Sequence, residues 1–357
     1  MTEKQNTGKE GPDLSVAIGN RNVSLSDVAR HAGVSTATVS RVLNNPEKVA
    51  EKSKTAVSNS IESLGYIPDG AARALASRQS RIIGAVVPTL DNALFANGIQ
   101  SLQRRLKYHG YTLLVASHEY DLKEEFNEVK ILLRQGVDGL LMVGSEHDKS
   151  LLQLLAEKQI PCVNCWAWET RSDIPYIGFD NHKAAKMAAD YLLDLGHVHL
   201  AVIAGRTENN DRAKNRLLGI RDAIEARNLE LPAERILERN YSVRQGRDAM
   251  RQLLKLQYPP TAVLCGNDIL ALGAVAECQH NEIRIPQEIS IAGFDDLDIS
   301  SQINPALTTV NVPSAKMGER AADYLVAQLQ RQPLAYPEEI ETRLMIRGTT
   351  APPQHGG

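Results

Sequence analysis

Hydrophobic positions after Ser80 alternate between two kinds of segment. Short apolar runs rich in β-branched residues, at 82–88, 111–117 and 137–143, have the composition of buried strands. Amphipathic stretches of helical period lie between them and end at glycine residues such as Gly110 and Gly136. This alternation predicts parallel sheets that are covered by helices on both faces.

The same rhythm begins again near residue 176 and continues toward the C-terminus. The pattern therefore predicts an α/β body of two doubly wound parallel-sheet lobes with a cleft between them. Folds of this kind bind ligands at the carboxyl ends of their strands. The later predicted strands are 176–179, 200–204, 262–265 and 289–294, and the predicted helices are 95–109, 123–135, 181–195, 213–227, 269–280 and 314–330.

The N-terminal part follows a different pattern. Residues 1–22 are polar and aperiodic, so we expect a disordered tail. Ser24 and Asp27 have the spacing of a helix-starting capping box. Gly33 can adopt the positive φ of a tight interhelical turn, and Ser35 can cap a second helix. Helix, glycine turn and helix at this spacing predict an all-α helix-turn-helix head.

The second predicted helix carries the chemistry of the head. Its apolar positions Val39, Val42 and Leu43 fall on one face. The opposite face offers short hydrogen-bonding groups and one guanidinium, which suit phosphate oxygens and base edges in a DNA major groove. The alternative is a generic three-helix cap whose polar face is only solvated. The exposed residues near the helix start are Ser35, Thr36, Ala37, Thr38, Ser40 and Arg41.

Composition and charge narrow the functional classes. The 357 residues are 43% hydrophobic and 23% charged, which is an ordinary globular composition for two or three domains. The net charge of -3 gives no overall preference for nucleic acid. The segment from Arg21 to Ser80, however, contains eight Lys or Arg residues and only five Asp or Glu residues. A basic head on an acidic body indicates that the two parts have different roles.

Several function classes lack their motifs. No run of about 18 apolar residues and no N-terminal apolar segment is present, so we expect a cytoplasmic protein without membrane contact. Cys162 and Cys165 lie inside a strand pattern and are expected to be buried thiols rather than a metal or redox site. Phosphate-loop, nucleophile-elbow and dinucleotide motifs are absent. We therefore expect no enzyme activity, cofactor or metal.

Longer segments resemble a known family. Residues 23–44, VSLSDVARHAGVSTATVSRVLN, look like the DNA-binding head of the LacI/GalR family of bacterial repressors. Residues 64–76, LGYIPDGAARALA, resemble the hinge of that family. Body segments 265–274, 291–296 and 305–310 are similar to further family landmarks, so the resemblance covers roughly residues 23–350.

The resemblance implies roles in DNA binding. Thr36 and Ala37 match the variable base-reading positions, and Arg41 matches a further base or phosphate contact. The hinge, 70–77, is too short to be a stable helix alone and would order only when it is paired on DNA. Leu75 would wedge into the minor groove at a central CG step and bend the duplex; the alternative is that it only packs in a linker. The remaining implied DNA contacts are Ser35, Thr38, Asn44 and Ala72.

The resemblance also implies an effector site between the lobes. Arg216 matches a ligand-contacting arginine, and Asp295 matches a carboxylate that accepts ligand hydrogens. The alternative is that these two side chains pair structurally across the cleft. A carboxylate, amides and an arginine around an aromatic wall suit a small polyol or sugar, because each hydroxyl needs a donor and an acceptor. The other implied effector residues are Phe95, Trp166, Tyr241, Asn267 and Asp268.

One position departs from the family pattern. Trp166 stands where many sugar-binding members have an acidic residue, which puts a plain lactose-like pocket in doubt. Asn92, Phe95 and the turn 178–181 resemble the gluconate-responsive branch instead.

The combined interpretation is a homodimeric regulator, most simply a repressor of a palindromic operator, controlled by a small metabolite. Contacts between its protomers would involve helix 95–109. A corepressor-dependent regulator, a sugar-binding protein with a vestigial head and a doubly wound enzyme remain alternatives. The expected parts are a tail (1–22), a head (23–68), a hinge (69–80), lobe 1 (81–178 and 312–337), lobe 2 (179–311 and 338–350) and a flexible tail (351–357).

Overall fold

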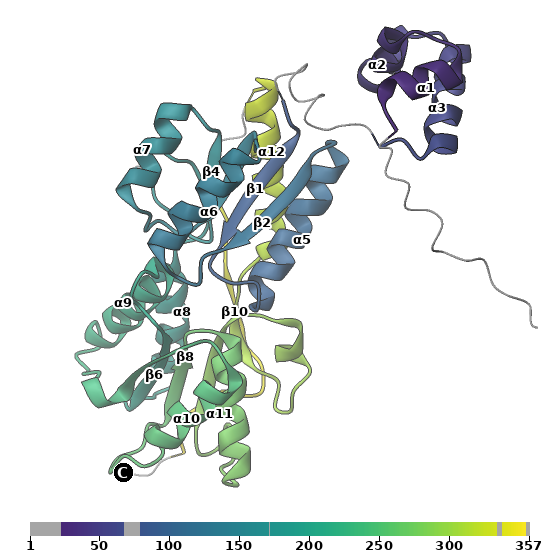
Figure 1. Cartoon of the computed structure of the whole chain (residues 1–357). Coiled ribbons are helices and arrows are strands. Elements are labelled where there is room, and N and C mark those ends of the chain that lie inside the picture. The colour runs from purple at the N-terminus through teal and green to yellow at the C-terminus, as the bar shows by residue number, and fades with distance from the viewer. Residues whose placement is uncertain (1–22, 68–78, 171, 334–337, 355–357) are drawn as a thin grey trace, which may run out of the picture. The chain divides into compact units, whose positions relative to one another are not determined.

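The computed structural model describes residues 23–67, 79–170, 172–333 and 338–354 (Figure 1). The expected N-terminal tail and the hinge positions Ala72 and Leu75 lie outside the described residues. The chain divides into two compact units, residues 1–80 and 81–357. No helix in the described ranges is long and apolar enough to cross a membrane.

The first unit contains the predicted helix-turn-helix. Ser24 and Asp27 form the capping box, with the Asp27 N–H donating to Ser24 Oγ at 3.3 Å and the Ser24 N–H donating to Asp27 Oδ2 at 3.0 Å. Gly33 ends the first helix in the left-handed region, at φ 66°. The prediction for this segment is therefore confirmed. Its elements are α1 (Leu25–Ala32), α2 (Thr36–Asn44), the 3-10 turn η2 (Pro46–Lys48) and α3 (Glu51–Leu64).

A small apolar core holds these helices together. Val28, Ala29, Val39 and Val57 are its buried residues and come from all three α-helices. This packing fixes α2 so that its opposite face points away from the core.

The second unit begins with a six-stranded sheet in the order β11-β5-β4-β3-β1-β2, in which every pairing is parallel. We call this sheet and its helices the first lobe. Helices α5 and α12 cover one face, and α6 and α7 cover the other (Figure 1). The strands are β1 (Ile82–Val87), β2 (Thr112–Ser117), β3 (Gly139–Val143), β4 (Cys162–Cys165), β5 (Tyr176–Gly178) and β11 (Glu338–Glu339), and the helices are α5 (Ala93–Tyr108), α6 (Leu122–Arg134), α7 (Lys149–Lys158) and α12 (Ser314–Gln330).

The second lobe is built on another six-stranded sheet, in the order β12-β10-β9-β8-β6-β7. All pairings are parallel except that of β12 with β10, which is antiparallel. Helices α8 and α9 cover one face, and α10 and α11 cover the other. The strands are β6 (Leu200–Gly205), β7 (Ile236–Arg239), β8 (Ala262–Cys265), β9 (Ser290–Asp295), β10 (Thr308–Asn311) and β12 (Arg343–Met345), and the helices are α8 (Asn181–Asp194), α9 (Asp211–Glu225), α10 (Val243–Leu253) and α11 (Asp268–His280); short 3-10 turns, η3 (Ala233–Arg235) and η4 (Asp298–Ser301), complete it.

The predicted fold class is confirmed by this arrangement of a helical head and two α/β lobes. One boundary differs: β11 pairs with β5, so residues 338–339 lie in the first lobe and not in the second, where the sequence placed them. The chain passes between the lobes after β5, after β10 and between β11 and β12. These crossings leave the strand ends of both sheets facing a common cleft.

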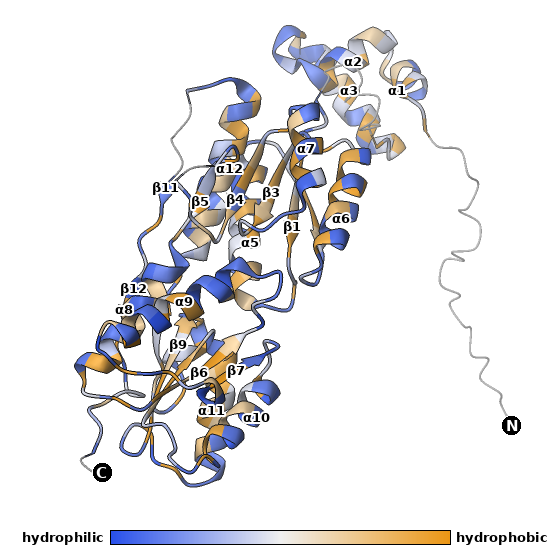
Figure 2. Ribbon diagram, turned by 90° about the vertical axis from the view of Figure 1, so that its left-hand side faces the viewer, coloured by the Kyte–Doolittle hydropathy of each residue, from blue (hydrophilic) through white to orange (hydrophobic). Residues whose placement is uncertain are grey.

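The buried strands explain why the apolar runs predicted them so well. Along β1, Ile83, Ala85 and Val87 point into the core beneath α5 and α12, whereas Val86 points into the core beneath α6 and α7. Both faces are apolar, as the orange strands in Figure 2 show. Helices α7 and α10 and strands β7, β10, β11 and β12 were not predicted. Strand β7 is a half-exposed edge strand. Helix α10 was overlooked although its buried residues Gly246, Ala249, Met250 and Leu253 have the i, i+3, i+4, i+7 spacing of an amphipathic helix.

Helices α5 and α12 cross at two glycines. A Cβ on Gly318 would overlap the carbonyl oxygen of Gly98 and lie 2.9 Å from the backbone nitrogen of Leu102. A Cβ on Gly98 would lie 2.5 Å from the indole ring of Trp166. Glycine therefore sets the close approach of α5 and α12 and the position of Trp166.

We predict that Gly318→Ala destabilises the body by about 1–3 kcal/mol, as expected for overpacking against backbone that cannot yield. The measurement is the denaturation midpoint of the full chain. Glu319→Ala is the matched control, since this neighbour on α12 is exposed and should change stability by less than about 0.5 kcal/mol. Equal midpoints for Gly318→Ala and the wild type would contradict the close-packing account.

Candidate functional site

The start of α2 forms an exposed polar face. Ser35, Thr36, Ala37 and Arg41 are exposed, and Thr38 is half-buried. Asn44 is exposed at the last turn. The structure thus brings the six predicted head residues onto one short helix and its cap.

Hydrogen bonds fix the start of this helix. Ser35 Oγ accepts from the Thr38 N–H at 3.1 Å and lies 2.9 Å from Thr38 Oγ1. The Ser35 and Thr38 hydroxyls therefore stabilise the N-terminus of α2. Arg41 makes no ion pair with any described residue, so its guanidinium is available to a phosphate or a base.

In the second unit, the carboxyl ends of β1, β2, β4, β6, β7, β8 and β9 supply or precede the residues around the cleft. Two connected spaces lie there, with Asn92, Tyr120, Asn210 and Tyr241 lining both. The outer vestibule has a volume of about 530 Å³. The inner chamber measures about 20 Å³, roughly the room that one water needs.

The two spaces have different linings. The outer vestibule is also lined by Thr89, Asp91, Glu119, Arg206, Glu208, Asn209, Arg239, Asn240 and Ile269. The inner chamber is also lined by Leu94, Phe95, Trp166, Arg212, Arg216, Asn267 and Asp295.

Arg216 and Asp295 form the charged part of the inner chamber. Both side chains are buried, and their nearest N–O distance is 3.7 Å, an ion pair without a hydrogen bond. Arg216 is held by Asn181 Oδ1 at 2.8 Å and the carbonyl oxygen of Gly266 at 2.7 Å, with its guanidinium 3.8 Å from the centre of the Phe294 ring. Both partners belong to the second lobe, so they do not pair across the cleft as the structural alternative required.

Asp295 is therefore a carboxylate in an unfavourable place. Burial raises the pKa of Asp295 well above its usual range, against the attraction of Arg216. Burial also lowers the pKa of Arg216. Hydrogen-bond donors that approach Asp295 would lower the free-energy cost of its burial, because a charged group without partners is unfavourable in a low-dielectric interior.

Four buried polar atoms at this chamber have no hydrogen-bond partner within the described part of the chain. They are Asp295 Oδ1, Asp295 Oδ2, Asn267 Nδ2 and Trp166 Nε1. Asn267 uses its other side-chain atom, Oδ1, to cap α11 by accepting from the Leu270 N–H at 2.9 Å. Its amide nitrogen is thereby held at the chamber that Asp295 and Trp166 also line. Each buried polar atom without a partner costs about 1–3 kcal/mol, so this set indicates where a polar ligand would bind.

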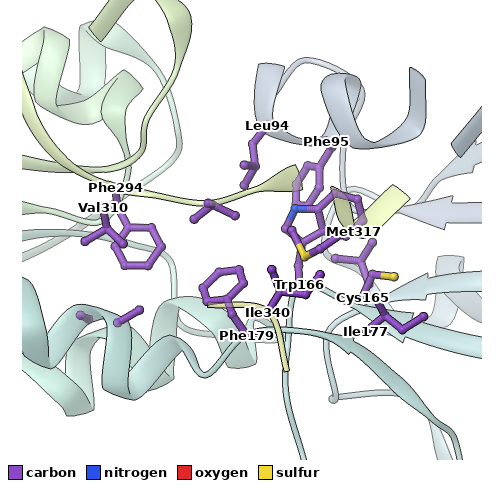
Figure 3. Packing of buried hydrophobic residues seen from close by; sticks show 14 of the residues in the cluster. Leu94, Phe95, Cys165, Trp166, Ile177, Phe179, Phe294, Val310, Met317 and Ile340 are labelled. Carbon is purple, nitrogen blue, oxygen red and sulfur yellow. The ribbon is translucent and has the colours of Figure 1, made fainter. Parts of the chain in front are cut away.

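Trp166 and Phe95 form the apolar wall. The two side chains lie next to each other (Figure 3). Their rings meet edge to face, with centroids 5.3 Å apart. Trp166 has φ 60°, and its carbonyl oxygen accepts from Asn181 Nδ2 at 2.8 Å. On the neighbouring side of this apolar cluster, Phe179 and Phe294 stack at 6.1 Å (Figure 3).

Asp268 is not part of the chamber, which corrects the prediction for this residue. Its carboxylate accepts hydrogen bonds from the Leu297 N–H, Ser300 Oγ and Thr309 Oγ1 at 2.9, 2.6 and 2.5 Å. Burial nevertheless raises the pKa of Asp268 to about 6. The side chain joins α11 to the segments around β9 and β10, and it turns away from the cleft that its neighbour Asn267 faces.

The sequence analysis missed Tyr120, Asn210 and Arg212 in the inner chamber, as well as the polar residues that line only the outer vestibule. Tyr120 follows β2, and its ring lies 6.3 Å from that of Tyr241. Asn210 and Arg212 lie at the start of α9. The polar run after β6 was a usable signal, because the carboxyl ends of parallel strands face the cleft. The two thiols Cys162 and Cys165 lie in β4 as free cysteines, Cys165 buried and Cys162 half-buried.

Known protein families match the head and the body of this chain, and a curated relative matches nearly its whole length. The family model of bacterial regulatory proteins of the lacI family matches residues 24–69, and that of the periplasmic binding protein-like domain matches residues 189–350. The chain is 34% identical over 331 residues to the HTH-type transcriptional repressor PurR of Klebsiella pneumoniae, covering 92% of this chain and 97% of that protein.

Two solved structures extend the similarity. The lac repressor dimer bound to operator and the anti-inducer ONPF is 28% identical with a TM-score of 0.81, covering 93% of this chain and 100% of that one. A complex of the transcriptional regulator CelR with cellobiose is 27% identical with a TM-score of 0.67, covering 92% of this chain and 99% of that one. With its helix-turn-helix head, its two-lobed body and this similarity along nearly the whole sequence, the chain belongs to the lacI family of bacterial regulatory proteins.

Proposed function

We propose that this protein is a transcriptional repressor that binds a palindromic operator as a homodimer and responds to a small polyhydroxylated metabolite in the interlobe cleft. The observation that carries the DNA-binding part is the exposed start of α2, held in place by the Ser35 cap and a closed apolar core. Similarity to the repressor PurR and to the operator-bound lac repressor supports the same role.

In this proposal α2 enters the major groove. Thr36 and Ala37 are small, so they would contact a thymine methyl group or one polar base edge rather than form bidentate pairs. Arg41 would add a base or phosphate contact, and Ser35, Thr38 and Asn44 would position the helix on the backbone. Ala72 and Leu75 would act at the hinge, with Leu75 as the minor-groove wedge.

The effector class follows from the unpartnered atoms of the inner chamber. Asp295 offers two acceptors, while Asn267 and Trp166 offer N–H donors. A sugar or sugar acid carries hydroxyls that satisfy both kinds of group.

Binding there would have to change the cleft. The inner chamber holds about 20 Å³, and the outer vestibule about 530 Å³. A sugar therefore reaches Asp295 only if Tyr120 and Tyr241 part or the lobes separate. This requirement would couple the effector to the relative orientation of the lobes, at a typical coupling energy of about 1–3 kcal/mol.

Dimerisation through the first lobe is supported by its open edge. β2 is the last strand of its sheet, Val115 on that strand is exposed, and Tyr108 at the end of α5 is 77% exposed. Such an edge needs cover, and a second copy related by two-fold symmetry would provide it and would match a palindromic operator.

For DNA binding, we predict that selection from random duplexes by the full chain at near-physiological salt recovers a palindrome with a central CG step. Arg41→Ala should then weaken binding by about 1–3 kcal/mol, the usual range for one specific contact. Lys52→Ala is the control, since Lys52 is exposed on α3 and its substitution also removes one positive charge from the head. Equal losses in the two variants would mean that only general electrostatic attraction acts.

For the effector, we predict that neutral sugars or aldonic acids such as gluconate raise the thermal midpoint of the full chain more than purine bases do. Asp295→Asn should abolish that increase, because an amide offers only one acceptor and adds a donor where the ligand needs two acceptors. Asp298→Asn, at an exposed carboxylate nearby, should retain it. A midpoint increase that survives Asp295→Asn would place the ligand elsewhere.

A further inference from the structure

The first turn of α9 in the second lobe lies against the end of β3 in the first lobe. Asp211 Oδ2 accepts from the Ser145 N–H at 3.0 Å and from Ser145 Oγ at 3.2 Å. Arg212 Nη1 donates to the carbonyl oxygen of Val143 at 3.2 Å and to Asp211 Oδ1 at 2.8 Å. Both side chains are buried, so these polar contacts between the lobes are shielded from solvent.

Gly144 makes this contact possible. It has φ 96°, and a Cβ there would overlap Arg212 Nη1 and lie 2.5 Å from Asp211 Oδ1. Any larger residue would therefore have to displace the two α9 side chains as well as adopt a strained backbone. The end of β3 is shaped to receive the first turn of α9.

The receiving segment is itself anchored inside the first lobe. The Gly144 N–H donates to the carbonyl oxygen of Cys165 at 2.9 Å. His147 Nδ1 lies 2.9 Å from Glu125 Oε1, and each of these two side chains is 1% exposed. Burial opposes protonation of His147, but hydrogen bonding and attraction from Glu125 raise its pKa. These contacts anchor the segment after β3 to β4 and α6, so its position against the start of α9 is fixed within the first lobe.

We infer that Asp211 and Arg212 form an interlobe latch on Gly144 and Ser145 that holds the two lobes together, with Arg212 as the positioning residue of the effector cleft. Arg212 lines the inner chamber, and both of its hydrogen bonds use Nη1. Its other N–H groups can donate to a ligand acceptor. The effect of a ligand on the latch rests on the proposed function; the latch itself requires neither DNA nor ligand.

Hydrogen exchange of the unliganded full chain tests the latch, because protection reports local opening. For each variant, amide exchange is measured in the lobe that does not carry the substitution. Asp211→Ala should speed exchange of the Ser145 amide by about tenfold, as expected when a protecting contact of about 1.4 kcal/mol is lost. Gly144→Ala should speed exchange in the first turn of α9 while leaving α10 unchanged. If one variant fails to fold, the other tests the same contact from its own lobe.

Lys214→Ala is the matched control. Lys214 lies on α9 and is exposed, and its ion pair with Glu146 of the first lobe is long, at 3.9 Å. Because such exposed pairs contribute little, the substitution should leave both exchange rates unchanged. Exchange changes confined to the mutated lobe, or equal changes in Lys214→Ala, would overturn the latch. Since the assay contains no DNA or effector, failure of the latch and failure of the repressor proposal are separate results.

Discussion

Parallel strands bring their carboxyl ends to one edge of a sheet, and in this protein two such edges face each other across the cleft. The functional geometry of the body depends on that constraint. It places Trp166 after β4, Asn267 after β8 and Asp295 at the end of β9 around one small chamber, although they are far apart in the sequence. The same constraint places Gly144, at the end of β3, opposite the start of α9.

Burial then gives the chamber its chemistry. Arg216 is satisfied by Asn181, the Gly266 carbonyl and the face of Phe294, whereas Asp295 has the nearby positive charge but no donor. In the proposed function, a ligand that donates hydrogen bonds would satisfy the Asp295 oxygens. The latch of Asp211 and Arg212 would hold the two lobes together around this chamber.

The sequence was most informative where both faces of an element are buried or where a cap has a defined spacing. β1 was predicted from its apolar run, and the capping box at Ser24 and Asp27 from three-residue spacing. Strand β7 was not predicted, since a half-exposed edge strand gives a weak pattern. Helix α10 was overlooked although its buried residues have helical spacing.

The effector residues illustrate a second limit. Asn267 and Asp268 are adjacent and equally polar, yet one lines the chamber and the other is fully hydrogen-bonded inside the lobe. Which way each points depends on the cap of α11 and on partners near residues 297–309, and no local pattern contains that information. Arg212 was missed for the same reason, because its partners Val143 and Gly144 lie in the other lobe.

The central claim is that the cleft controls operator binding by the head. The most direct measurement is a fluorescence-anisotropy titration of the selected operator with the full chain, at fixed salt, with and without a saturating metabolite that stabilises the body. The account predicts an operator affinity that changes by about 5- to 150-fold, the usual range of allosteric coupling. A metabolite that binds at Asp295 and leaves the operator affinity unchanged would contradict it.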